Sequence, residues 1–465
     1  MNAIRVPAAG GFVRQGTAAA FVGIVGALAG LMFGLDIGVI SGALKFIQRE
    51  FRVGDGTIEW VVSSMMAGAA LGAVVASKVS AALGRKRSLM LGSVVFVLAS
   101  LLCAAAWSVG VLIAARMLLG VSIGILTFTA PLYLAEIASR DRRGALVSTY
   151  QLMVATGVFL AFLSDTAFSY AGQWRWMLGV IAVPGALFLL GLSALPDSPR
   201  WLMMRGREEE AQEVLVRLRG HAEEARREAD EIREQLRIPQ RGWHMFLENR
   251  NFRRSVGLGL LLQGMQQFTG LNVVMYYAPR IFEAMGYRGE AQFWFTAAVG
   301  LTNMVATLIA IALVDRLGRK PILCIGFLVM AAGLAAVGTM MHLGIRTHGE
   351  QVFTVAMLLM FIVGFGMSAG PLIWILCSEI QPIKGRDFGI GCSTVANWVC
   401  NMLVGVTFLS LLSGIGHAQT FWLYGVLNAL FILLTLAFVP ETKHVTLEHI
   451  ERRLMAGEPL RRIGQ

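Results

Sequence analysis

The amino-acid sequence predicts an all-α polytopic membrane protein with 12 transmembrane helices, arranged in two pseudo-symmetric six-helix halves with a cytoplasmic helical linker. Three observations support this fold class. Of the 465 residues, 56% are hydrophobic and only 15% are charged, whereas soluble domains carry roughly 25% charged residues. Twelve apolar windows are each long enough to cross a bilayer. Short motifs of the first half also recur, in the same order, in the second half.

The apolar windows are close to the length that a helix needs to cross the hydrocarbon core. The predicted spans are 18–44, 59–81, 88–107, 109–135, 144–167, 176–195, 252–281, 291–314, 320–342, 352–379, 386–412 and 418–439. We therefore expect an N-terminal six-helix half at 1–199, a linker at 200–250, a C-terminal six-helix half at 251–442 and a tail at 443–465.

Basic residues gather in alternate loops. Arg85–Arg87, the central block and the tail from Lys443 onward fall on one side, whereas the opposite loops hold few basic residues, such as Arg175. By the positive-inside rule, both termini and the linker are cytoplasmic. This sorting also explains the net charge of +11, so the charge does not indicate nucleic-acid binding.

The linker and the tail both show helical patterns. Arg205–Leu236 contains no proline and has Glu and Arg neighbours at three- and four-residue spacing, so we expect one helix there. Thr446–Met455 predicts a short surface helix. The five cysteines all fall in apolar runs, which predicts buried thiols rather than a disulfide framework or a metal site.

The two halves share three motifs. Gly84-Arg85-Lys86 recurs as Gly318-Arg319-Lys320, and Pro196-Asp197-Ser198 recurs as Pro440-Glu441-Thr442. A glutamate and an arginine seven residues apart also recur, as Glu136/Arg143 and Glu379/Arg386. Parallel halves with a binding site between them near the middle of the membrane are typical of secondary transporters.

The segment Leu262–Pro279 is unusually polar for a membrane span. It carries Gln263, Gln266, Gln267, Asn272, Tyr276 and Tyr277. An unpaired amide costs several kcal/mol in hydrocarbon, so these groups must face a wet cavity or a neighbouring helix. Amides and aromatic rings suit a neutral, hydroxyl-rich ligand. The alternative is that the amides only join helices by hydrogen bonds.

Helix geometry adds a constraint to this segment. At 100° per residue, Gln263, Gln266 and Gln267 share one face, but Asn272 lies opposite Gln263 on an unbroken helix. All of them can line one cavity only if the helix breaks near Thr269–Gly270, and we predict that it hinges at Gly270.

Asp36 lies inside the apolar run Phe33–Gly42, where a carboxylate is costly unless it is protonated, paired or hydrated. Arg116 of the fourth span is predicted at a similar depth and is the expected partner. A buried carboxyl beside a cation can alternate between its charged and neutral forms, as a proton-coupling site requires. The alternative is a permanent ion pair that only fixes helix packing.

Charged residues at the cytoplasmic ends form a predicted gate that parts in one state of the transporter and closes in the other. The alternative is that the basic residues only anchor the loops. The first copy also departs from the second, because Ala81 and Ala82 stand where Asp315 and Arg316 stand. The predicted gate residues are Arg85, Glu136, Arg143, Asp315, Arg319, Glu379 and Arg386.

Further polar groups occur within spans. Gln151 and Asn303 lie in the fifth and eighth spans, and the eleventh carries Asn397, Trp398 and Asn401. In the tenth span, Pro371 predicts a kink between Gly370 and Trp374. No GxxxxGK[ST] motif is present, which argues against transport driven by ATP, and no catalytic arrangement supports an enzyme.

Gln266–Asn272, Pro196–Arg200, Asp315–Lys320 and Pro440–Lys443 together resemble the sugar-porter family of the major facilitator superfamily. The resemblance runs from about Ala27 to the C-terminus. Phe33–Gly42, Trp60–Met66, Leu163–Tyr170 and Glu379–Gly389 are similar to segments of its bacterial proton-coupled members.

The resemblance implies roles for individual residues. It implies that the hexose is bound by Gln151, Gln266, Gln267, Asn272, Asn303, Trp374 and Asn401. It implies that the same cavity is lined by Phe33, Gln263, Tyr276, Tyr277, Gly370, Asn397 and Trp398. Asp36 and Arg116 stand at the proton-coupling position, where facilitative members have an amide.

The expected function is proton-coupled uptake of a hexose, galactose or also glucose, by alternating access. Uptake of arabinose or another pentose with a proton, and proton-independent uniport, are the alternatives. We expect a multi-pass monomer in the bacterial inner membrane that contacts lipid, a monosaccharide and protons, with no nucleic acid, metal or cofactor.

Overall fold

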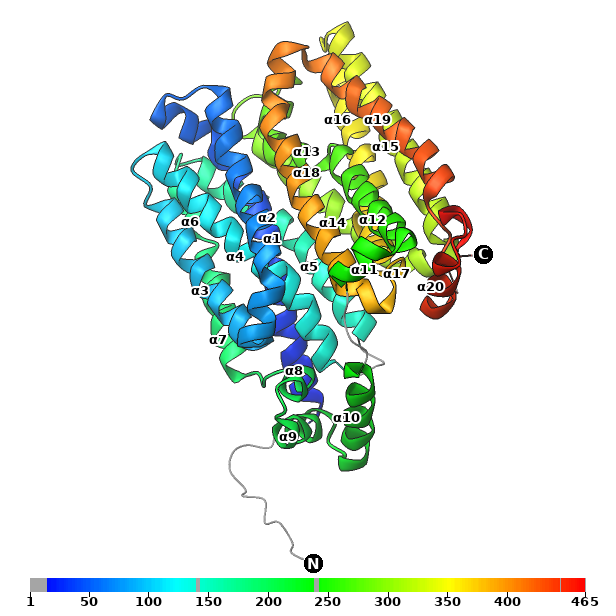
Figure 1. Ribbon diagram of the computed structural model, residues 1–465. Coiled ribbons are helices and arrows are strands. Elements are labelled where there is room, and N and C mark those ends of the chain that lie inside the picture. The colour runs from blue at the N-terminus through cyan, green and yellow to red at the C-terminus, as the bar shows by residue number, and fades with distance from the viewer. Residues whose placement is uncertain (1–14, 139–142, 238–241, 444, 465) are drawn as a thin grey trace, which may run out of the picture.

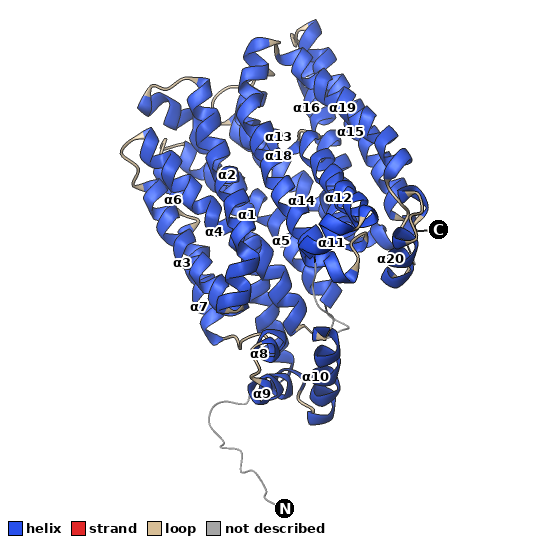
Figure 2. Ribbon diagram, in the orientation of Figure 1, coloured by secondary structure: helices blue, strands red, loops and turns tan. Residues whose placement is uncertain are grey.

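The computed structural model describes residues 15–138, 143–237, 242–443 and 445–464, and its regular elements there are helices (Figure 1, Figure 2). The first half contains α1 (Gln15–Phe51), α2 (Asp55–Leu83), α3 (Arg85–Ala104), α4 (Val109–Ile137), α5 (Arg143–Ser169), α6 (Trp174–Gly179) and α7 (Ala182–Ala194). The segment between the halves contains α8 (Pro199–Met204), α9 (Glu208–Arg219), α10 (Ala222–Leu236) and α11 (Gly242–Glu248).

The second half repeats this plan with more interruptions. It contains α12 (Arg250–Phe268), α13 (Leu271–Ala284), α14 (Ala291–Leu317), α15 (Arg319–Leu343), α16 (His348–Met367), α17 (Ala369–Glu379), α18 (Arg386–Gly414) and α19 (His417–Phe438). The short surface helix predicted at Thr446–Met455 follows as α20 (Leu447–Met455), and the Thr446 hydroxyl caps it. In Figure 1 the two halves lie side by side, and α8–α10 lie beyond one end of the first half. We call this the linker end.

Eleven helical segments of the described chain are long and apolar enough to cross a membrane. The broken pair α12 and α13 supplies the twelfth crossing, because each piece alone is too short or too polar. Eleven of the twelve predicted spans are therefore confirmed, although several helices extend past them, and α12 and α13 occupy the twelfth, 252–281. The largest difference is in α1, which ends at Phe51 rather than at residue 44. The residue boundaries given above for the halves, linker and tail stay predictions.

The single helix predicted over Arg205–Leu236 is wrong. The chain forms α9 and α10 instead, because Gly220 adopts a left-handed conformation with φ of 79° and ends α9. Only glycine adopts that conformation without a steric cost, so the two helices turn back on each other there. Leu215, Ala225, Ala229 and Ile232 form a small apolar core between them.

Helix α1 packs against α5 through a row of glycines at every fourth position. A Cβ atom added at Gly34 would lie 2.0 Å from the carbonyl oxygen of Val154, and one added at Gly38 would lie 2.3 Å from the Cβ of Ala161. Small residues allow helix backbones to approach this closely in membranes. The two helices are therefore in contact along their backbones on both sides of Asp36.

The predicted break at Gly270 is confirmed. Helix α12 ends at Phe268, and Gly270 has a left-handed conformation with φ of 89° before α13 begins. A second break separates α16 from α17 at Ser368, upstream of the kink predicted at Pro371. Proline has no N–H to donate and clashes with the preceding turn, so the helix restarts ahead of it.

Substituting Gly270 with alanine is expected to destabilise the fold by about 1–3 kcal/mol, because a left-handed conformation is costly for a residue with a Cβ atom. The new Cβ atom would also lie 2.9 Å from the Tyr424 ring. Thermal unfolding of the purified protein measures the effect. Gly264→Ala is the matched control, because that glycine lies inside α12 with nothing within 4 Å. An equally stable Gly270→Ala variant would contradict the argument.

Candidate functional site

The amides of α12 lie at the break between α16 and α17. The Gln266 Nε2 atom donates to the backbone carbonyls of Ala369 (2.8 Å) and Gly370 (3.0 Å). From α18, the Asn397 Nδ2 atom donates to the side-chain oxygens of Gln263 (2.6 Å) and Gln266 (2.9 Å). One amide cluster therefore joins α12, α17 and α18 at the level where two helices are interrupted.

Asn272 joins this cluster across the break in α12–α13. Its Nδ2 atom donates to the Gln267 Oε1 atom at 2.5 Å, and Gln267 donates to Gln266 at 3.4 Å. The break itself is stabilised by Asn428 of α19, whose Nδ2 atom donates to the Thr269 carbonyl at 3.1 Å. Backbone groups that a break releases inside a membrane need such partners. The break thus brings Asn272 to the glutamines, as the helix geometry required.

Aromatic residues border the amide cluster. The Asn401 Nδ2 atom donates to the Tyr276 hydroxyl at 3.1 Å. The rings of Phe33 and Trp398 meet edge to face with centroids 5.6 Å apart, which links α1 of the first half to α18 of the second. The Tyr277 hydroxyl instead donates to the Gly405 carbonyl at 3.0 Å, and its ring stacks on Phe408. Tyr277 is therefore engaged in packing against α18.

Three of the predicted sugar-binding side chains do not join the cluster. Gln151 on α5, Asn303 on α14 and Trp374 on α17 form no hydrogen bond with its amides among the residues that the structure describes. Trp374 is 37% exposed. Their roles stay predictions that rest on the family resemblance.

Asp36 and Arg116 meet inside the first half, as predicted. The Arg116 Nη1 atom lies 3.9 Å from the Asp36 Oδ1 atom, and neither residue is exposed. This distance is too long for a hydrogen bond, and the Arg116 Nε atom donates instead to the Val61 carbonyl of α2 at 2.8 Å. Neither Asp36 oxygen has a hydrogen-bond partner within the described chain. The pair is close enough for electrostatic attraction but is not locked by hydrogen bonds.

The predicted gate residues form equivalent clusters in the two halves. Glu136 pairs with Arg85 at 2.9 Å and accepts a hydrogen bond from the Ser198 hydroxyl. Glu379 pairs with Arg319 at 3.4 Å and accepts from the Thr442 hydroxyl at 2.6 Å. The two hydroxyl partners were not among the predicted gate residues, although their repeated Pro-acid-hydroxyl motif was a signal for them.

Three of the predicted gate residues are not part of these clusters. The side chains of Arg143 and Asp315 lie outside the described residues. Arg386 does not pair with Glu379 here. Its Nε and Nη2 atoms are buried without a hydrogen-bond partner in the part of the chain that is described.

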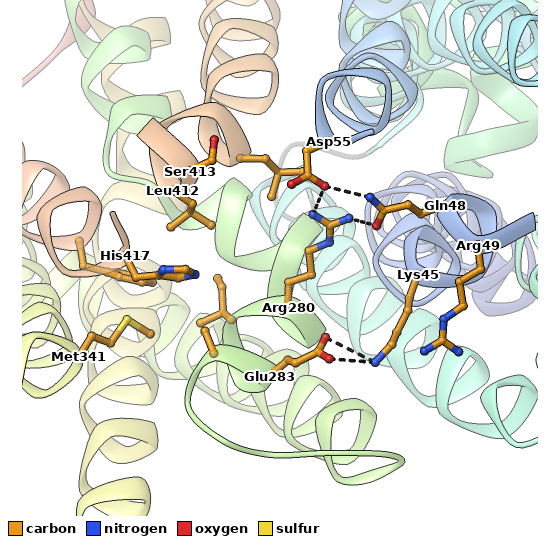
Figure 3. Close-up of a pocket in the computed structure, with 14 residues that line it drawn as sticks. Lys45, Gln48, Arg49, Asp55, Arg280, Glu283, Met341, Leu412, Ser413 and His417 are labelled. Atoms are coloured by element: carbon orange, nitrogen blue, oxygen red, sulfur yellow. Dashed lines mark hydrogen bonds and ion pairs between the residues drawn. The ribbon is translucent and has the colours of Figure 1, made fainter. Parts of the chain in front are cut away.

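The end opposite the linker, which we call the far end, holds contacts between the halves that the sequence did not predict (Figure 3). The Arg280 Nη1 atom on α13 lies 2.7 Å from the Asp55 Oδ1 atom of α2, and Lys45 of α1 pairs with Glu283 at 3.3 Å. These pairs flank a cavity of about 550 Å³. Glu59 of α2 is buried beside α18 and accepts from the Ser410 N–H and hydroxyl, both at 2.7 Å. These contacts between the halves close the far end, whereas each described gate pair at the linker end lies within one half.

Two bundles of membrane-crossing helices, with broken helices and an amide cluster in the second bundle that borders Phe33 of the first, define a transporter of the major facilitator fold. Residues 22–454 match the family model described as "Sugar (and other) transporter". The chain belongs to this family.

Curated relatives resemble almost the whole chain. The galactose-proton symporter of Escherichia coli K12 is 62% identical over 445 residues, with 96% of each chain covered. The arabinose-proton symporter of the same strain is 57% identical over 448 residues, with 96% of this chain and 95% of the relative covered. The D-xylose transporter of Levilactobacillus brevis is 38% identical, with 94% and 96% covered.

Solved structures agree with this assignment. A partially occluded inward-open structure of the E. coli xylose transporter XylE has a TM-score of 0.81 and 28% identity, with 92% of this chain and 100% of that chain covered. XylE bound to 6-bromo-6-deoxy-D-glucose, described as a proton:xylose symporter of the major facilitator superfamily, has a TM-score of 0.78 and 29% identity, with 94% and 98% covered.

Proposed function

We propose that this protein takes up a hexose together with a proton across the bacterial inner membrane by alternating access. Galactose is the first expected substrate and glucose the second. The proton coupling rests on one observation. Asp36 and Arg116 are buried together in the first half at 3.9 Å, without a hydrogen bond between them. The galactose assignment is supported by the 62% identity to a galactose-proton symporter.

The amide cluster fits a neutral sugar. Each amide offers both donors and an acceptor, so Gln266, Gln267 and Asn272 can exchange hydrogen bonds among themselves for bonds to sugar hydroxyls. The Trp398 ring beside Phe33 offers an apolar face for C–H groups of the sugar. Because the cluster carries no charge, it favours a neutral ligand over a sugar phosphate.

Proton binding at Asp36 removes the energetic cost of a buried carboxylate that has no hydrogen-bond partner within the described chain. A protonated Asp36 lets the halves close around the sugar, and its deprotonation toward the cytoplasm leaves Arg116 as its electrostatic partner. The membrane potential supplies about 2.3 kcal/mol per proton for each 100 mV. No cofactor is needed, and the proton itself is the coupling ion.

The proposed orientation follows from the basic loops, which place the linker end and both termini in the cytoplasm. In that orientation the far end faces outward, and its contacts between the halves would close the outside. A monomer is sufficient for this mechanism, because the site lies between two halves of one chain.

Adding galactose to de-energised cells that contain the protein is expected to raise the pH of a lightly buffered medium transiently, because each sugar carries a proton inward. A pH electrode measures this change, and a protonophore should abolish it. Sugar entry without alkalinisation would show a uniporter and would exclude proton coupling.

Competition against labelled galactose uptake identifies the substrate. Galactose and glucose are expected to compete more strongly than arabinose and xylose. Stronger competition by arabinose would favour the second reading, pentose-proton symport, which the 57% identity to an arabinose-proton symporter supports.

A further inference from the structure

We propose that Arg280 is a positioning residue for transport, which fastens α13 to the first half while the outside is closed. Helix α13 carries the sugar-site residues Asn272 and Tyr276. The inference rests on the proposed function and adds to it a residue that contacts neither the sugar site nor the proton site.

The guanidinium of Arg280 joins three helices. Its Nη1 atom donates to the Asp55 Oδ1 atom of α2 at 2.7 Å, and its Nη2 atom donates to the Gln48 Oε1 atom of α1. Gln48 in turn donates to Asp55 at 3.0 Å, so the three side chains form a closed ring (Figure 3). The planar guanidinium presents two branches at a fixed angle, and a lysine cannot reproduce this double contact.

A parallel contact lies one turn farther along α13. The Lys45 Nζ atom of α1 donates to both carboxylate oxygens of Glu283, at 3.3 and 3.4 Å. The outer end of α13 is thus tied to α1 at two successive levels. Helix α1 also carries Asp36, so these contacts connect the helix of the sugar site to the helix of the proton site.

Helix α13 needs such contacts because its own chain does not hold it in place. The break at Gly270 separates it from α12, and Tyr277 is non-helical within it (φ −116°, ψ 17°) beside Pro279. A helix of 14 residues with a break at one end and a kink inside takes its direction from its neighbours. The ring of hydrogen bonds among Arg280, Gln48 and Asp55 fixes the direction of α13 at its outer end.

The contacts are suited to opening and closing in each cycle. The Arg280 and Asp55 side chains are 21% and 48% exposed and lie beside the 550 Å³ cavity, so water screens their attraction. Half-exposed ion pairs are individually weak. They hold α13 while the outside is closed without preventing it from reopening.

Labelling of a buried cysteine tests the proposal. Ser63 is fully buried on α2, faces Gly405 of α18 and has no hydrogen-bond partner within the described chain. The assay uses Ser63→Cys in a full-length chain whose native cysteines are replaced. An impermeant maleimide added from outside reports how often the outer end opens. Arg280→Gln is expected to raise the labelling rate about 5-fold, and Arg280→Lys by less, because a half-exposed pair contributes about 1 kcal/mol.

The matched control is Arg175→Gln. Arg175 pairs with Glu50 at 2.8 Å at the same end of the molecule, but both residues belong to the first half. Its removal is expected to leave labelling unchanged. A second pair of variants tests the parallel contact: Lys45→Glu should speed labelling, and adding Glu283→Lys should restore the original rate.

Equal labelling of Arg280→Gln and Arg175→Gln would overturn the proposal. If Arg280→Gln does not reach the membrane, Glu283→Gln provides the same comparison. The labelling assay contains no sugar, so its outcome is independent of sugar-proton symport. A failure of the proposed function would appear instead as absent alkalinisation in the unsubstituted protein.

Discussion

Replacing Asp36 by asparagine is expected to abolish accumulation of sugar against its gradient while sugar exchange continues. Asparagine has nearly the same size but cannot take up or release a proton. The amide cluster lies on α12, α13 and α18 and is unchanged by the substitution. Labelled galactose uptake by energised cells measures accumulation, and counterflow in proteoliposomes measures exchange.

Asp165→Asn is the matched control for this experiment. Asp165 is a second buried carboxyl of the first half, but it accepts the Gly42 N–H at 2.8 Å and has no ion pair among the described residues. Asparagine retains that acceptor, so accumulation should persist. If Asp36→Asn still concentrates galactose, Asp36 is not the coupling carboxyl.

Replacing Gln267 by alanine is expected to weaken galactose binding by about 5- to 150-fold, because a lost hydrogen bond to a buried polar group costs about 1–3 kcal/mol. Among the described residues the Gln267 side chain bonds only to Asn272 and Gln266, so its truncation leaves the backbone at both helix breaks satisfied. The fold should therefore remain intact. Isothermal titration of the purified protein with galactose measures the affinity.

Gln292→Ala controls for the general loss of a buried glutamine. Gln292 of α14 donates to the Tyr287 carbonyl at 2.8 Å, away from the amide cluster. Its substitution should not change galactose affinity. Unchanged affinity in Gln267→Ala would place the sugar elsewhere. Together with Asp36→Asn, this variant separates the binding of sugar from the coupling to protons.

Most of the fold follows from local sequence. Apolar length determines the twelve spans, and the polar faces of Leu262–Pro279 required the break that Gly270 provides. The linker shows the limit of this reasoning, since Gly220 ends a helix through its backbone conformation rather than through its polarity. Likewise, Pro371 indicated a kink but not that the helix breaks at Ser368 and restarts at Ala369.

The candidate site was only partly predictable. Asp36 and Arg116 were matched by depth although the predicted end of α1 was wrong, because a buried carboxylate has few possible partners. The contacts of Arg280 were missed for two reasons. Its partners Gln48 and Asp55 lie beyond the predicted apolar windows, and the contact joins helices of different halves. Sequence patterns within one helix do not show which helix of the other half it contacts.

The glycine row between α1 and α5 has a mechanical consequence. Gly34 and Gly38 bring the backbone of α1 into close contact with α5. The segment around Asp36 therefore cannot slide along α5 without steric clashes. The close packing of this helix pair therefore holds Asp36 at a fixed place within the first half. In the proposed alternating-access cycle, Asp36 would then change its proton affinity through the water that enters when the second half withdraws, and the broken helices of that half would take up the deformation.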